Sequence, residues 1–164
     1  MRTRVIIAAL AAFAFASPAA AQEQVSFDSV RVERARKLLD RAERRWESHD
    51  LKGARSAFAQ ATWILQEQQV YAGPALLSLA YVTYADGRPA DAAKVLVEAS
   101  AEAARFGDVE LQAQSLYEAS IAAAEAGDRK AARAHRADAQ RVMGSGYLPI
   151  ASRQKLAVRF AIAD

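Results

Sequence analysis

The side chains that could carry out acid–base or metal chemistry in this chain are few, and they lie far apart. The two histidines, His49 and His135, are separated by 86 positions in a chain of 164 residues, and no HExxH spacing occurs. Cysteine is absent, which excludes a disulfide framework, a thiolate nucleophile and a cysteine-based metal site. We therefore expect two surface or capping histidines, with no bound metal and no cofactor.

The remaining motifs fit structural roles better than catalytic ones. Gly144-Ser145-Gly146 has no G-x-S-x-G frame and no preceding strand, so it predicts a hinge and not a nucleophile elbow. No glycine pattern for binding a phosphate or a dinucleotide occurs. Glu43 and Glu47 lie one helical turn apart among arginines, which is typical of ion pairs on a helix surface. The sequence predicts a protein that is not an enzyme.

The first 21 residues have the pattern of a signal peptide. Arg2 and Arg4 precede an apolar run over residues 5–16, and these 12 residues are too few to span a bilayer, which takes roughly 20. Small residues at Ala19 and Ala21 suit signal peptidase, so we expect cleavage after Ala21. The protein is then periplasmic or secreted, with no stable membrane anchor. A retained N-terminal anchor is the alternative.

Charge is unevenly distributed along the predicted mature chain. Removal of 21 residues from the 164 leaves 143, enough for one domain with a core. Residues 86–125 carry 3 basic and 8 acidic residues, whereas residues 126–164 carry 8 basic and 3 acidic residues. Such polarity can orient a partner or a neighbouring copy, but ordinary solvated helix faces are the favoured explanation. Acidic residues are interspersed among the basic residues of 31–47, so we expect no nucleic-acid partner.

Three turn segments repeat at spacings of 38 and 40 residues, starting at His49, Gly87 and Gly127. Each leads into a set of three positions that share one face of a helix. The first position holds a small residue, the second lies four residues later, and the third, seven residues after the first, is small again. The three sets are Ala54, Phe58 and Ala61; Ala92, Leu96 and Ala99; and Ala132, Arg136 and Ala139.

This stripe resembles the second helix of a tetratricopeptide repeat (TPR). Leu79-Ala80 matches the large–small pair of the family's first helix, and Ala42 and Ser120 fill the small position in the other two hairpins. Arg41, Ala119 and Arg136 depart from the family pattern, and the spacings exceed its period of roughly 34 residues. The resemblance implies helix hairpins that pack closely where small residues meet. A plain antiparallel helical array is the alternative.

The predicted fold class is all-α: a TPR-like solenoid of three antiparallel helix hairpins plus a short C-terminal capping helix. After the signal peptide (1–21) and a short extension (22–28), the repeat domain covers 29–143 and the Gly-Ser-Gly break with the capping helix covers 144–164. Asp28 or Ser29 is expected to cap the first helix. The last helix starts at Pro149 and carries Ile150, Leu156 and Phe160. The other helices are expected at about 51–69, 74–85, 89–106, 108–126 and 128–143.

The TPR resemblance also implies a concave face lined by the first helix of each hairpin. Aromatic side chains on such a face anchor peptides well; the alternative is that Trp46 and some tyrosines pack between hairpins or under the last helix. Leu39 and Glu43 occupy places where the chaperone-binding class has its carboxylate clamp, so that function is not expected. The predicted groove residues are Leu39, Glu43, Trp46, Leu77, Tyr81, Tyr84, Tyr117 and Ile121.

The function expected from these features is that of an exported interaction module or scaffold, which binds a peptide or helix of a protein partner in the cell envelope. One alternative is self-assembly, in which hairpins of opposite charge stack head to tail into an oligomer. A second alternative is an accessory subunit of an unidentified envelope enzyme, which a cleft holding several groups of strongly shifted pKa would favour.

Overall fold

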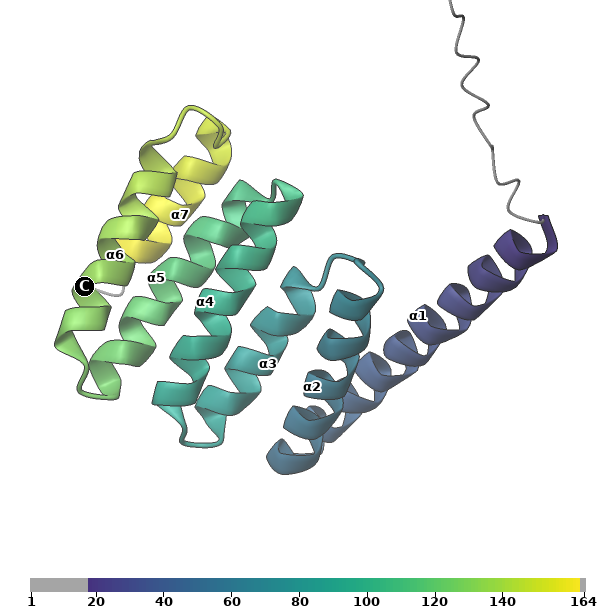
Figure 1. The fold of residues 1–164 in the computed structure, drawn as a ribbon. Helices are drawn as coiled ribbons and strands as arrows, with labels where there is room; N and C mark the ends of the chain where they lie inside the picture. The colour runs from purple at the N-terminus through teal and green to yellow at the C-terminus, as the bar shows by residue number, and fades with distance from the viewer. Residues whose placement is uncertain (1–17, 163–164) are drawn as a thin grey trace, which may run out of the picture.

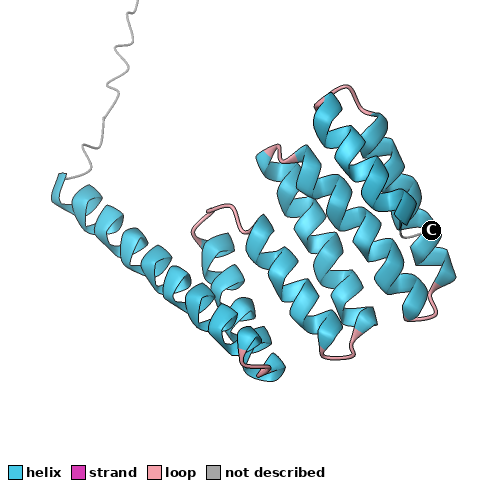
Figure 2. Ribbon diagram, turned by 180° about the vertical axis from the view of Figure 1, so that it is seen from behind, coloured by secondary structure: helices cyan, strands magenta, loops and turns pink. Residues whose placement is uncertain are grey.

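The computed structural model describes residues 18–162, which form seven α-helices and contain no β-strand (Figure 1). This confirms the all-α prediction. Short turns join the helices, and from α1 to α6 each helix packs against the next one in the chain (Figure 2). The helices are α1 (Pro18–Glu47), α2 (Leu51–Glu67), α3 (Gly73–Ala85), α4 (Pro89–Phe106), α5 (Val109–Glu125), α6 (Arg129–Gly144) and α7 (Ile150–Ile162).

The helix ends follow local signals in the sequence. Asp108 and Asp128 cap α5 and α6, because their carboxylates accept hydrogen bonds from backbone N–H groups in the first turn of each helix. Gly107 and Gly127 end the preceding helices with φ of 76° and 85°, a left-handed conformation that glycine adopts without a Cβ penalty. Pro89 starts α4, where its missing N–H costs nothing. The predicted Gly-Asp boundaries are confirmed.

The start of the first helix differs from the prediction. Helix α1 begins at Pro18 and not near Asp28, and its N-terminal half extends away from the other helices (Figure 1). The predicted cleavage site after Ala21 and the predicted extension 22–28 therefore fall within α1. The run from Ala19 to Gln24 consists of strong helix formers, and a cap worth about 1 kcal/mol does not stop a helix that such residues can continue. The rest of the signal segment, residues 1–17, lies outside the described residues.

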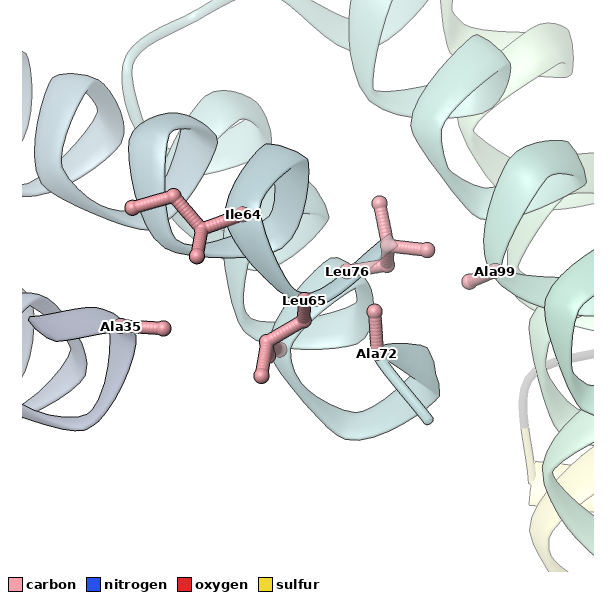
Figure 3. Packing of buried hydrophobic residues seen from close by; sticks show 7 residues of the cluster. Ala35, Ile64, Leu65, Ala72, Leu76 and Ala99 are labelled. Atoms are coloured by element: carbon pink, nitrogen blue, oxygen red, sulfur yellow. The ribbon is translucent and has the colours of Figure 1, made fainter. Parts of the chain in front are cut away.

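Small residues occupy the centres of the helix crossings, as the repeated stripe predicts. Ala54, Ala92 and Ala99 are fully buried, and Ala92 packs in one cluster with Ala80 of α3 and Leu96. Ala132 is only half-buried. A neighbouring cluster joins four helices (Figure 3). It contains Ala35 of α1, Ile64 and Leu65 of α2, Ala72 just before α3, Leu76 of α3, and Ala99 of α4. Because the alanine side chain is small, the helix axes approach closely at these crossings and pack densely.

Helix α7 lies along α5. Leu148, Leu156 and Phe160 are buried in one cluster with residues of α5 and α6. Of the three apolar residues that the last helix was predicted to carry, Leu156 and Phe160 are buried, whereas Ile150 is 73% exposed. Six positions separate Ile150 from Leu156, which on a helix with 3.6 residues per turn places them on different sides. Leu148, in the preceding turn, contributes the buried side chain instead. Within residues 18–162 no helix is long and apolar enough to cross a membrane.

Candidate functional site

Three of the eight predicted groove residues meet around one hollow. Tyr81 and Tyr84 of α3 face Ile121 of α5 across a space of about 150 Å³. We call this space the α3–α5 hollow. Its lining consists of Ala80, Tyr81, Tyr84, Leu96, Glu118, Ile121 and Ala122. The side chain of Leu96 is contributed by α4, so three successive helices shape the hollow, and apolar carbon makes up most of its surface.

Hydrogen bonds hold Tyr81 in place within this hollow. The hydroxyl of Tyr81 donates to Oε1 of Glu118 over 2.8 Å. The side-chain amide of Gln114, one turn earlier on α5, donates to the Tyr81 hydroxyl over 3.0 Å and to the same Glu118 oxygen over 3.2 Å. The polar end of Tyr81 is thus bound to α5, which fixes the orientation of its ring.

Tyr84 forms the outer wall of the hollow. It is 38% exposed, and its hydroxyl is hydrogen-bonded to the carboxylate of Glu125 at the C-terminal end of α5. That hydrogen bond is the main cause of a raised pKa for Tyr84, and burial and the negative charge of Glu125 act in the same direction. Glu125 itself is exposed. Tyr84 therefore presents an accessible aromatic ring at the edge of the hollow.

Tyr117 stands one turn before Ile121 on α5 and is covered by α7. Its ring stacks on Phe160 with centroids 3.7 Å apart and planes 15° apart, and its hydroxyl donates to the backbone oxygen of Phe160 over 2.8 Å. Tyr117 is only 4% exposed, so its ring is covered in the free protein and does not line an open groove. The alternative, that some aromatic residues pack under the last helix, is correct for Tyr117.

The other four predicted residues do not line the α3–α5 hollow. Trp46 of α1 is half-buried and packs edge-on against Phe58 of α2, with ring centroids 6.4 Å apart and planes at 83°. Leu39 and Leu77 are half-buried and pack against core clusters, whereas Glu43 is exposed on α1. The structure brings together Tyr81 and Tyr84 of α3 with Ile121 of α5, and leaves the other predicted groove residues outside the hollow.

Sequence reasoning missed the acidic side of the site. Glu118, Ile121 and Glu125 follow one another at three and four positions on α5, which places them on one face of the helix. The prediction included Ile121 and Tyr117 but neither glutamate. The spacing of Glu118 and Glu125, seven residues apart, was the signal in the sequence that could have placed both glutamates on the face of Ile121.

Two further hollows lie between the second helices of successive hairpins. The α2–α4 hollow has a volume of about 350 Å³ and the α4–α6 hollow about 370 Å³. Basic side chains are prominent in the first, and alanines in the second. The α2–α4 hollow is lined by Lys52, Arg55, Ser56, Ala59, Leu79, Thr83, Arg88, Asp91 and Val95. The α4–α6 hollow is lined by Ala90, Ala93, Lys94, Val97, Ala123, Ala126, Asp128, Ala131 and His135.

The most strongly perturbed tyrosine belongs to a structural contact. Burial is the main cause that raises the pKa of Tyr71, and its hydroxyl donates over 2.7 Å to Asp108, the residue that caps α5. The ring of Tyr71 also packs on Phe106, with centroids 5.1 Å apart. This contact ties the turn before α3 to the turn before α5. In the described part of the chain, no three His, Asp or Glu side chains are grouped so that they could hold a metal ion.

Comparison with protein-family models, curated proteins and solved structures finds no match for this chain.

Proposed function

We propose that this protein is an exported, non-enzymatic interaction module with a TPR-like architecture, which binds a peptide or helical segment of a protein partner at the α3–α5 hollow. The single observation that carries this proposal is the meeting of Tyr81, Tyr84 and Ile121 around an apolar space on the molecular surface. Tyrosine gives a large contact area and loses little conformational entropy on binding, which makes it a common anchor at interfaces.

Rigidity of the surroundings supports this function. The Tyr81 hydroxyl is hydrogen-bonded to Glu118 before any partner arrives, and both tyrosines stand on the same helix, three residues apart. A preformed surface does not have to be ordered during binding, so more of the contact energy remains as affinity. A short segment that reaches Tyr84 also reaches Tyr81, because these positions are neighbours on a helix.

The TPR-like part of the proposal is supported by the two larger hollows. The four α4 residues that line the α4–α6 hollow stand 38 positions after residues that line the α2–α4 hollow, and four of its other five lining residues stand 40 positions after such residues. These are the spacings of the three turn segments in the sequence. Arg55 and Ala93, for example, hold equivalent positions, as do Val95 and His135. Successive hairpins that stack with the same geometry create equivalent hollows, which is expected of a solenoid.

Export is supported by the basic start of the chain, the short apolar run and the small residues before Gln22. We expect the mature protein to begin at Gln22. Mass spectrometry of the protein purified from its native cells tests this directly. A mass that includes Met1 or residues 5–16 contradicts export by signal cleavage.

Binding is tested by substituting Tyr84 and Tyr81 with alanine, singly and together. Loss of one aromatic anchor is expected to cost about 2 kcal/mol of binding energy, a roughly thirty-fold loss of affinity. Capture of envelope partners by the immobilised protein is measured beside thermal unfolding. Tyr147→Ala serves as the control, because Tyr147 is 85% exposed and lies outside the hollow. Unchanged capture by the double variant overturns the proposal, and so does lost capture that merely accompanies unfolding.

The self-assembly alternative is less well supported by the charges. Residues 29–48 carry 7 basic and 4 acidic residues, and residues 126–164 carry 8 basic and 3 acidic residues. Head-to-tail stacking brings these two ends together, and like charges repel. Light scattering at low and high salt separates the two functions, because a charge-driven oligomer dissociates as salt rises.

A further inference from the structure

We propose that two copies of this protein form a dimer by exchanging their last helices, so that α7 of each copy docks on α5 and α6 of the other. The surface that binds the second copy is the one that α7 covers within a single chain. The α3–α5 hollow takes no part in the exchange, which is therefore independent of the proposed function. Three features of the described residues support it: the contacts of α7, the segment that joins α7 to α6, and the apolar side chains exposed at that segment.

Helix α7 binds α5 through specific contacts at both of its ends. Near its C-terminal end, Phe160 stacks on Tyr117 and accepts a hydrogen bond from the Tyr117 hydroxyl over 2.8 Å. Near its N-terminal end, the side chains of Ser152 and Lys155 donate to the carboxylate of Glu110 over 2.6 and 3.0 Å. A second copy offers the same groups in the same places, so its α5 binds α7 with the same contacts.

The exchange costs little because it preserves these contacts. In the closed monomer they lie within one chain, and in the dimer they lie between two chains, so their energy is the same in both. The balance between monomer and dimer then depends on the segment that connects α6 to α7, and on the freedom that two copies lose when they associate.

The connecting segment, residues 144–147, is suited to a second course of the backbone. Neither Gly144 nor Gly146 has a positive φ, and a Cβ atom at either position would have open space around it. The closed turn therefore does not require glycine at these two positions, whereas the backbone freedom of glycine eases a rearrangement. Leu148, the next residue after the segment, is buried in the cluster of α7 and moves with that helix.

The closed turn also leaves one polar group unsatisfied. Arg153 of α7 donates from Nη2 to the backbone oxygen of Ser145 over 3.1 Å. Its Nε is buried and has no hydrogen-bond partner among the described residues. A buried donor without an acceptor is unfavourable, so the closed form of this segment is not fully stabilised.

Two apolar side chains at the connecting segment are exposed in the monomer. Tyr147 is 85% exposed and Ile150 is 73% exposed, the highest values among the large apolar side chains of the described residues. In a two-fold symmetric exchange the connecting segments of the two copies pass each other, because each one crosses to the other copy. The side chains of Tyr147 and Ile150 then gain an apolar neighbour, and their burial favours the dimer.

The exchanged dimer responds to salt in the opposite way to a stack held together by charge. Residues 126–164 carry 8 basic and 3 acidic residues, and the exchange brings these regions of two copies close together. Salt screens their repulsion, so we expect the dimer of the wild type to become tighter as salt rises. A wild-type dimer that weakens as salt rises overturns the exchange.

The decisive test uses complementary charge reversals in the full exported protein. Glu110→Lys and Lys155→Glu each place like charges at the contact between α7 and α5, in the monomer and in a dimer of one variant alike. In an equal mixture, exchange allows α7 of each variant to meet the opposite charge on the other. We expect the mixture to form a dimer whose dissociation constant, measured by sedimentation equilibrium, is roughly ten-fold lower than that of the wild type.

Two controls identify the contact that is responsible. The double variant Glu110→Lys/Lys155→Glu restores opposite charges within one chain, so its dissociation constant should return to that of the wild type. The pair Glu33→Lys and Lys37→Glu reverses an ion pair of 3.9 Å within α1, a helix that is not exchanged. Mixing these two variants should leave the association of the wild type unchanged.

The association of the mixture decides the outcome even where the wild type stays monomeric at the concentrations used. A mixture of Glu110→Lys and Lys155→Glu that associates no more tightly than each variant alone overturns the exchange. An equal gain for the α1 pair overturns it as well, because a general attraction between the variants then explains both. Neither result affects the proposed function, since Tyr81 and Tyr84 are unaltered. Thermal unfolding of each variant confirms that it is folded at the temperature of the measurement.

Discussion

The carboxylate of Glu102 on α4 accepts a hydrogen bond from the backbone N–H of Ala72, 3.2 Å away and 30 positions earlier in the chain. Ala72 is the N-cap of α3, and its own side chain makes no capping bond. Glu102 is 7% exposed, and Arg105 donates to both of its oxygens at 3.0 and 2.9 Å. The carboxylate of one helix thus caps the neighbouring helix, while an arginine pairs its charge.

Removal of this remote cap is expected to destabilise the fold. Glu102→Ala leaves the buried N–H of Ala72 without its acceptor, at a cost of about 1–3 kcal/mol. Denaturant unfolding measures the loss. In the matched variant Glu98→Ala, one turn earlier on α4, an exposed carboxylate that accepts from Gln66 is removed, and a change within about 0.5 kcal/mol is expected. Equal losses in the two variants contradict the role of Glu102.

Enlargement of the small residue at the α3–α4 crossing is expected to overpack it. Ala92 is fully buried beside Ala80 and Leu96, so Ala92→Phe forces the helices apart at a cost of about 1–3 kcal/mol or more. Ala101 is exposed on the same helix, and Ala101→Phe provides the control. Thermal unfolding compares the two variants. A melting temperature of Ala92→Phe equal to that of the wild type shows that the helices do not cross at this residue.

The docking of α7 is expected to depend on Phe160. Phe160→Ala removes the ring that stacks on Tyr117, and truncation of a core phenylalanine costs roughly 3–5 kcal/mol. Because α7 is the last helix, we expect it to open locally, with faster hydrogen exchange in α7 than in α3 and α4. Val158→Ala, at a side chain that is 62% exposed, should leave the exchange of α7 unchanged. Full protection of α7 in Phe160→Ala excludes this anchor.

The docking of α7 is also expected to weaken in acid. The pKa of Glu110 is lowered below its ordinary value of 4.5 mainly by two hydrogen bonds. The bond from the Ser152 hydroxyl has the larger effect, and the bond from Lys155 comes second. A lowered pKa in the folded protein means that Glu110 stabilises the fold above the ordinary pKa, and that this contribution is lost as the pH falls through the lowered pKa. The melting temperature of Glu110→Gln should therefore lie below that of the wild type at neutral pH.

As the pH falls through the lowered pKa, the two melting temperatures should converge, because Glu110 of the wild type becomes protonated. Ser152→Ala removes the hydroxyl that donates to Glu110 over 2.6 Å, so convergence should begin at a higher pH in that background. A difference between wild type and Glu110→Gln that is the same at neutral and acid pH shows that the charge of Glu110 does not act on α7.

Local signals were sufficient for most helix boundaries. In the pairs Gly107-Asp108 and Gly127-Asp128, the glycine ends one helix and the aspartate caps the next. The groups involved lie within a few residues of each other, so neighbouring sequence alone determines these helix ends. The start of α1 at Pro18 was missed for a related reason. A possible cap at Asp28 competes with the strong helix formers from Ala19 to Gln24, and local sequence does not decide which preference prevails.

By itself, then, the sequence determined the helices, their ends and the alanines at their crossings, because these depend on residues within one or two turns. Only the tertiary structure decided which side of each helix remains exposed. Tyr117 and Glu118 are neighbours in the chain, but successive residues on a helix point about 100° apart. As a result Tyr117 is buried under α7, whereas Glu118 lines the α3–α5 hollow. Burial is set by the helices that pack on each side, and those come from distant parts of the chain.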